Sequence, residues 1–101
     1  NYQLYPYRQI TNDDEKPIRA FIFQKAGKTC IIYWHMNGTG QLTLDIEKNK
    51  LSLMNESGKR IPIQSAGSKS ILPAAGRLIL ETALPQEEVI KLFRKSIEII
   101  K

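Results

Sequence analysis

The sequence predicts an all-β domain: a two-sheet antiparallel β-sandwich of seven or eight strands, with one short helix before the last strand. β-rich stretches alternate with turn residues at intervals of about 8 to 12 residues, the spacing of sandwiches and barrels. Residues 41–47 alternate strictly between apolar and polar side chains, as in an antiparallel strand with one face in a core. Only residues 85–95 carry a helical pattern. Strand number alone does not separate a sandwich from a closed barrel, so both architectures stay open.

The first predicted strands are punctuated by two turn signals. Residues 19–25 and 28–36 flank Ala26-Gly27, a short glycine turn that predicts a hairpin. Asn37-Gly38 follows, and it is a strong hairpin signal because both residue types tolerate positive φ. We therefore expect a second tight turn into residues 41–47.

The strand over residues 41–47 has the clearest pattern. Leu42, Leu44 and Ile46 share one face, and polar side chains occupy the other, so one face should meet the core and the other water. Three shorter β-leaning stretches follow, at residues 51–54, 61–64 and 69–72, and a further one runs over residues 77–83.

Residues 85–95 combine several signals of one helix. A proline opens the segment, acidic residues follow in the first turn, and basic residues gather near the end, where they complement the helix dipole. Apolar side chains at a spacing of three to four residues would pack this helix on the sheets. Residues 96–100 alternate again, and we predict a closing strand there with Ile97 and Ile99 inward.

Trp34 shares its predicted strand face with the apolar residues Cys30, Ile32 and Met36. A large aromatic residue among apolar neighbours favours burial, so we place Trp34 in the core.

Tyr33 and His35 lie on the opposite face of the same strand, together with Ile31. They either form a surface pair or line a second buried layer, and Ile31 on their face favours burial. If they are accessible, Tyr33 and His35 are the candidate carbohydrate contacts of the chain, because sugar-binding surfaces stack aromatic rings on pyranose faces.

We find no set of residues that carries a reaction, a metal or a cofactor. His35 is the only histidine, and no G-x-S-x-G turn presents a serine nucleophile. Cys30 is the only cysteine, which excludes an internal disulfide and a zinc or iron-sulfur site, and its apolar surroundings favour a buried small residue. The acidic residues do not suggest a carboxylate pair in one cleft. We predict no catalytic, cofactor-binding or metal-binding residue.

The net charge of +5 raises the question of an anionic partner. The basic residues are scattered through predicted turns and form no stripe, so we interpret them as solvated loop charge and do not expect a nucleic-acid partner. The longest apolar runs, such as residues 30–34, are far shorter than the roughly 20 residues that cross a bilayer, so we expect no membrane span.

At 101 residues the chain suits a single domain. We divide it into a lead-in or linker over residues 1–16 and a β-sandwich domain over residues 17–101. Three tyrosines in the first segment suggest that part of it docks on the domain or on a neighbour. The chain begins with Asn1, so we expect that upstream residues have been removed.

Two parts of the sequence together resemble a known family. Residues 20–23 and 27–35 form an early hairpin, with a glycine turn and an apolar strand that carries Trp34. Residues 76–82 then lead into the predicted helix and closing strand. This pattern, over roughly residues 18–100, resembles the small C-terminal β-sandwich domains that follow the catalytic barrel in many bacterial glycoside hydrolases.

The resemblance implies a non-catalytic accessory domain that packs against and supports a catalytic domain of the same polypeptide. It also implies a secreted or periplasmic protein, with every catalytic residue outside this chain. A carbohydrate-binding module that uses Tyr33, His35 or the N-terminal tyrosines is the alternative. A small nucleic-acid-binding β-barrel, motivated by the positive charge and the strand aromatics, is a weaker one.

Overall fold

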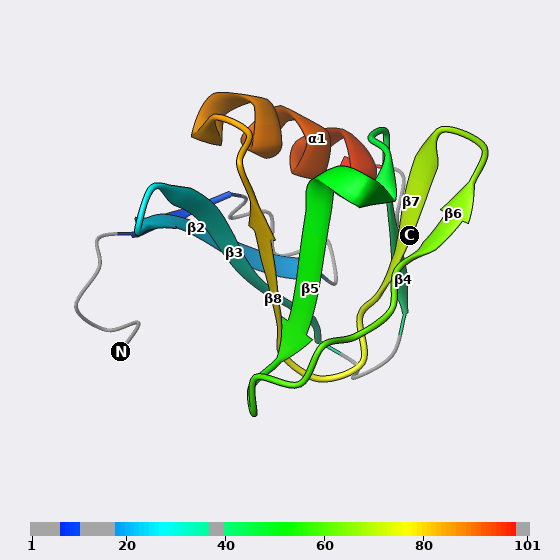
Figure 1. The fold of residues 1–101 in the computed structure, drawn as a ribbon, viewed down its shortest axis with the longest axis horizontal. Helices are drawn as coiled ribbons and strands as arrows, with labels where there is room; N and C mark the ends of the chain where they lie inside the picture. The colour runs from blue at the N-terminus through cyan, green and yellow to red at the C-terminus, as the bar shows by residue number, and fades with distance from the viewer. Residues whose placement is uncertain (1–6, 11–17, 37–39, 99–101) are drawn as a thin grey trace.

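The computed structural model of the chain describes residues 7–10, 18–36 and 40–98. These residues form strands, one 3-10 turn and one α-helix (Figure 1). Their bounds are β1 Tyr7–Gln9, β2 Ile18–Lys25, β3 Lys28–His35, β4 Gln41–Leu44, η2 Lys48–Lys50, β5 Leu51–Asn55, β6 Gln64–Ala66, β7 Lys69–Pro73, β8 Leu78–Thr82 and α1 Gln86–Glu98.

The strands make two antiparallel sheets. The larger has the order β1-β2-β3-β8-β5 and the smaller the order β4-β7-β6. Figure 1 shows the larger sheet on the left, the smaller on the right, and α1 across the top. The mainly β class with two antiparallel sheets and a helix near the C-terminus is therefore confirmed.

The hairpin predicted at Ala26-Gly27 is confirmed. Strands β2 and β3 pair in register from Ile18 opposite His35 to the end of the hairpin. Both turn residues have positive φ, 53° at Ala26 and 79° at Gly27, as a two-residue type I′ turn requires. The turn twists in the same sense as the strands it joins, which keeps this long hairpin regular.

The hairpin predicted at Asn37-Gly38 is wrong. The turn itself lies outside the described residues, but the strands that flank it belong to different sheets. Strand β3 already pairs with β2 on one side and β8 on the other, so it has no free edge for β4. β4 pairs with β7 instead.

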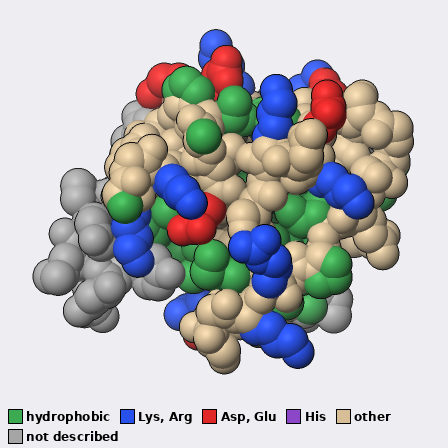
Figure 2. Space-filling model, viewed as in Figure 1, with side chains coloured by type: hydrophobic (Ala, Val, Ile, Leu, Met, Phe, Trp, Pro, Cys, Tyr) green, Lys and Arg blue, Asp and Glu red, His purple; other side chains and the backbone are tan. Residues whose placement is uncertain are grey.

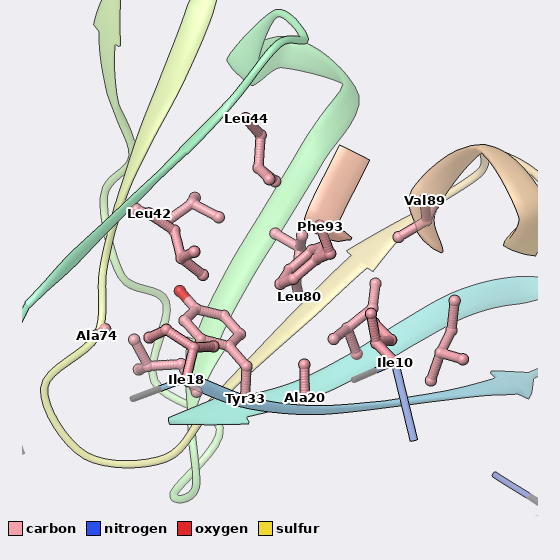
Figure 3. Close-up of a cluster of buried hydrophobic side chains, with 14 of the residues drawn as sticks. Ile10, Ile18, Ala20, Tyr33, Leu42, Leu44, Ala74, Leu80, Val89 and Phe93 are labelled. Atoms are coloured by element: carbon pink, nitrogen blue, oxygen red, sulfur yellow. The ribbon is translucent and has the colours of Figure 1, made fainter. Parts of the chain in front are cut away.

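One core joins both sheets and the helix. Figure 3 shows Leu42 and Leu44 of β4 and Phe93 of α1 pointing toward the side chains of the larger sheet, among them Tyr33 and Leu80. The Tyr33 and Phe93 rings meet edge to face, with centroids 5.7 Å apart. The inward positions predicted for Leu42 and Leu44 are confirmed.

The prediction of a closing strand over residues 96–100 is wrong for the part of this segment that the structure describes. Residues 96–98 continue α1, and residues 99–101 lie outside the described part of the chain. Val89, Phe93 and Ser96 are all buried, at a spacing of four and three residues, so one helix face continues past Lys95. No glycine or proline interrupts it there, and the short alternation that suggested a strand fits a helix equally well.

Part of the segment interpreted as a lead-in joins the sheet. β1 pairs with β2, and the Ile10 amide donates a hydrogen bond of 2.8 Å to the Ala20 carbonyl. The Ile10 side chain is buried in the core, and its own carbonyl accepts a 3.0 Å hydrogen bond from Nε of Arg94. This segment therefore ties the sheet edge to the helix.

The strand predicted over residues 61–64 is displaced. β6 begins only at Gln64. The chain before it lies along β5, with a bridge between Met54 and Arg60 and a 2.9 Å hydrogen bond from the Ile61 amide to the Leu53 carbonyl. These contacts cover part of the free edge of β5, which limits edge-to-edge pairing there.

Candidate functional site

Both faces of the larger sheet are apolar. The inner face belongs to the core. The strand registers place a second set of side chains on the opposite side, which we call the outer face. Its members are Arg19, Phe21, Phe23, Lys25, Lys28, Cys30, Ile32, Trp34, Ile79, Glu81, Ser52 and Met54.

The outer face is arranged in rows across the strands. The registers align Phe21, Ile32, Ile79 and Met54 in one apolar row that crosses β2, β3, β8 and β5. A sheet with one side in water normally alternates apolar and polar residues. This sheet is apolar on its second side as well.

The placement of Trp34 in the core is wrong. Trp34 belongs to the outer face, where it lies opposite Arg19 and is only partly buried. The predicted grouping with Cys30 and Ile32 was right, but the core contains the other face of the strand. Because both faces of β3 are apolar, strand alternation did not show which one faces inward.

The Trp34 ring has two close contacts on this surface. It stacks beside Phe21 with centroids 5.7 Å apart and an interplanar angle of 20°. The Arg77 guanidinium carbon lies 5.2 Å from the Trp34 ring centroid, within cation-π range. Arg77 is exposed, so its guanidinium lies between the ring and the solvent.

Exposure increases along the outer face of β3 from Cys30 onward. Lys28, beside the hairpin turn, is exposed, Cys30 is 0% exposed, Ile32 and Trp34 are partly buried, and Met36, beyond the strand, is 56% exposed. Met36 is the large apolar residue most open to water in the described part of the chain. We define the Trp34 corner as Trp34, Met36, Arg77, Phe21 and Arg19, because the apolar residues beside β3 are most accessible there.

Cations outnumber carboxylates on the outer face. Arg19, Lys25 and Lys28 belong to it through their strand positions, and Arg77 through its contact with Trp34, whereas Glu81 is the one carboxylate assigned to it. Figure 2, drawn from the same side as Figure 1, shows hydrophobic side chains over the strands of the larger sheet with Lys and Arg among them. The face thus combines apolar area with positive charge.

Cys30 lies on the buried end of this face. Its thiol lies 3.8 Å from Oε2 of Glu81, as a weak donor. Burial, and secondarily the Glu81 carboxylate, raise the pKa of the Cys30 thiol to about 11, and Lys25 and Lys28 oppose this shift. The thiol is therefore protonated at neutral pH, the opposite of what a nucleophilic cysteine needs.

Tyr33 is buried, as its shared face with Ile31 predicted. Its ring is 0% exposed, and its hydroxyl donates a 2.8 Å hydrogen bond to the Pro73 carbonyl of β7. Burial raises the pKa of the Tyr33 hydroxyl, because the phenolate would lose its hydration. The role of Tyr33 is thus to join the two sheets.

His35, at the end of β3, is half-buried against the backbone of Gly40. A Cβ at Gly40 would lie 2.7 Å from Cδ2 of His35, so only glycine fits beside this ring. The structure does not bring Tyr33 and His35 together on an open surface. Their sugar contact stays a prediction.

The described residues contain no group of three or more His, Cys, Asp or Glu side chains placed to hold a metal ion. A search of the same residues finds no helix with the length and apolar character to cross a membrane.

No protein-family model, curated protein or solved structure matches this chain.

The sequence reasoning missed Phe21 and Arg77. A signal for Phe21 was present, because Phe21 and Phe23 occupy alternate positions of one predicted strand and therefore share a face. Arg77 begins the predicted strand over residues 77–83, and its position over Trp34 depends on the pairing of β8 with β3, which the sequence does not specify.

Proposed function

We propose that this chain is a non-catalytic accessory β-sandwich domain of a carbohydrate-active enzyme. In this role it packs against a catalytic domain of the same polypeptide and supports it. The chain itself performs no reaction.

The observation that carries this proposal is the apolar outer face of the larger sheet. The core uses the inner face of that sheet, so the row of Phe21, Ile32, Ile79 and Met54 adds nothing to the contact between the sheets. Apolar surface beyond what the core requires, bordered by charged residues, is typical of interfaces between domains.

The contacts between the sheets support the sandwich. Tyr33 of the larger sheet and Leu72 of the smaller lie in one buried cluster. The hydrogen bond from Tyr33 to the Pro73 carbonyl crosses from one sheet to the other. In a sandwich, side chains from two inner faces interdigitate in this way.

The carbohydrate-active assignment comes from the resemblance of residues 18–100 to the C-terminal domains of glycoside hydrolases. The state of the reactive side chains agrees with a supporting role. Cys30 is held protonated in a buried position, and Tyr33 is committed to the contact between sheets.

Removal of this domain from its parent polypeptide tests the proposal. The remaining catalytic domain should lose thermal stability, with a Tm lower by several degrees, because the surface that met the outer face becomes exposed to water. The isolated chain should show no turnover of xylans, glucans or mannans. A catalytic domain with an unchanged Tm, or turnover by the isolated chain, would contradict the proposal.

A carbohydrate-binding module is the second candidate, because Trp34 presents a partly exposed aromatic ring beside Phe21. The position of Arg77 counts against it, since the guanidinium lies over the ring where a pyranose would stack. Titration of the single tryptophan's fluorescence with xylans, glucans and mannans separates the two functions. A saturable response that is lost in Trp34→Ala would favour the module, and a flat response favours the accessory domain.

A further inference from the structure

We propose that the Trp34 corner is the docking surface for the neighbouring catalytic domain, and that this partner presents a carboxylate to Arg77 beside an apolar patch. The inference rests on the proposed function and adds the location and the chemistry of the contact. Arg77 over the Trp34 ring is the anchor, and Phe21 and Met36 supply apolar area around it.

The geometry of Arg77 prepares it to receive a carboxylate. Its guanidinium lies over the Trp34 ring, which limits the orientations of a long and otherwise mobile side chain. A contact of the guanidinium carbon with a ring face uses no N–H hydrogen bond, and carboxylates accept two parallel N–H hydrogen bonds from arginine. Within residues 7–10, 18–36 and 40–98, no carboxylate forms an ion pair with Arg77.

The composition of the corner fits a contact between proteins. Tryptophan and arginine are the residues most enriched among those that dominate binding energy, and they act best when apolar neighbours exclude water around them. Met36 is 56% exposed and flexible, which lets it adapt to the surface it meets. The corner therefore combines a rigid anchor with an adaptable edge.

The charge of the outer face disfavours a second copy of this chain as the occupant. Two copies that met through the Trp34 corner would bring Arg77 of one copy near Arg77 of the other. Glu81, a carboxylate that the strand registers place on the outer face, already contacts the Cys30 thiol. An acidic partner gains attraction where a second copy meets repulsion.

Single-stranded nucleic acid also matches the positive charge, but the outer face lacks the platform it needs. Bases stack on successive exposed rings. Here Arg77 lies over Trp34, Phe21 already stacks beside that ring, and the row beyond Phe21 continues through Ile32, Ile79 and Met54, which carry no ring. We therefore favour a protein surface.

Amide hydrogen exchange of the isolated chain and of the parent polypeptide tests the inference. In the parent, residues 32–36 and 76–79 should exchange about tenfold or more slowly than in the isolated chain, because local opening is suppressed under an interface. Arg77→Glu in the parent should remove most of this added protection. Lys69→Glu is the matched control: it makes the same charge change at an exposed position of β7 in the other sheet, and it should leave the protection unchanged.

Other results of the hydrogen-exchange experiment overturn the location of the contact, its chemistry or the accessory function. Protection that appears elsewhere on the chain overturns the location and leaves the accessory function standing. Protection at the Trp34 corner that survives Arg77→Glu overturns the carboxylate contact. The absence of added protection anywhere overturns the accessory function as well. A dimer of the isolated chain protected at this corner, or binding of single-stranded DNA at low salt that Arg77→Glu abolishes, assigns the surface to another partner and overturns the inference.

Discussion

The two faces of the larger sheet have similar composition and different roles. Ile31 and Ile32 are adjacent on β3, yet Ile31 lies in the core and is 0% exposed, whereas Ile32 lies on the outer face and is partly exposed. The inner face is covered by the smaller sheet and by α1. This difference teaches that an apolar strand face need not lie in the core.

The largest predicted effect compares these two isoleucines. Ile31→Ala should lower the free energy of unfolding by about 2 to 5 kcal/mol, because it leaves a cavity in a closed core. Ile32→Ala should cost about 1 kcal/mol, since its side chain is partly in water already. Urea unfolding of both variants measures the difference, and equal losses would show that the isolated domain needs both faces equally.

The second prediction concerns the end of β3, where Gly40 lies against His35. Gly40→Ala should destabilise the fold by about 1 to 3 kcal/mol, because φ is 147° there and the new Cβ would meet the imidazole ring. Gly67→Ala is the matched control, with a φ of 64° and open space around the position. Thermal unfolding should show the larger loss for Gly40→Ala, and a larger loss for Gly67→Ala would contradict the packing of His35.

The third prediction concerns one buried, weakly acidic side chain on each face of the larger sheet, the Cys30 thiol on the outer face and the Tyr33 hydroxyl on the inner face. Both pKa values are raised in the folded protein, so both groups favour folding below their unfolded pKa values and lose this contribution as pH rises. For Cys30 the loss should run from pH 9.0 to about 11, and for Tyr33 it should continue above that range. Urea unfolding across this range should give a flatter profile for Cys30→Ser, and an unchanged profile would contradict the burial of the thiol.

The smallest predicted effect lies on the helix side of the core. The Ser96 hydroxyl is buried, and within the described part of the chain it has no hydrogen-bond partner. Ser96→Ala should therefore be neutral or stabilise by up to about 0.5 kcal/mol, since alanine is also the better helix former. Thr29→Ala is the contrast, because the Thr29 hydroxyl donates a 2.7 Å hydrogen bond to the Leu84 carbonyl and its loss should cost about 1 to 2 kcal/mol. Chemical unfolding of both variants compares them, and a clear loss for Ser96→Ala would contradict the orphaned hydroxyl.

Local signals in the sequence predicted much of the fold. The turn at Ala26-Gly27, the inward positions of Leu42 and Leu44 and the start of the helix all depend on neighbouring residues, and all agree with the structure. The helix end was missed because residues 96–98 carry no stop signal. Local pattern does not separate a short closing strand from one more helical turn.

The local sequence pattern did not predict which distant strands pair with each other. Asn37-Gly38 has the chemistry of a tight hairpin, but the pairing of β3 with β8 takes the strand edge that such a hairpin needs. The hydrogen bonds that connect distant elements, such as Thr29 to Leu84 and Tyr33 to Pro73, depend on this topology too.

The candidate site also depends on features that the local sequence pattern does not specify. Strand alternation grouped Trp34 correctly and then assigned the wrong group to the core, because both groups are apolar. The Arg77 contact joins β3 to the residue just before β8, far away in the sequence, so no spacing rule finds it. The sequence therefore predicted two apolar faces of β3 but not which of them forms the outer face.

Acrylamide quenching of the fluorescence of Trp34, the single tryptophan, tests most directly whether the outer face lies outside the core. In the isolated chain we expect quenching intermediate between that of a free tryptophan and that of a buried one, and in the parent polypeptide clearly weaker quenching. Trp34 emission that resists acrylamide in the isolated chain as fully as a core residue would contradict the assignment of the two faces.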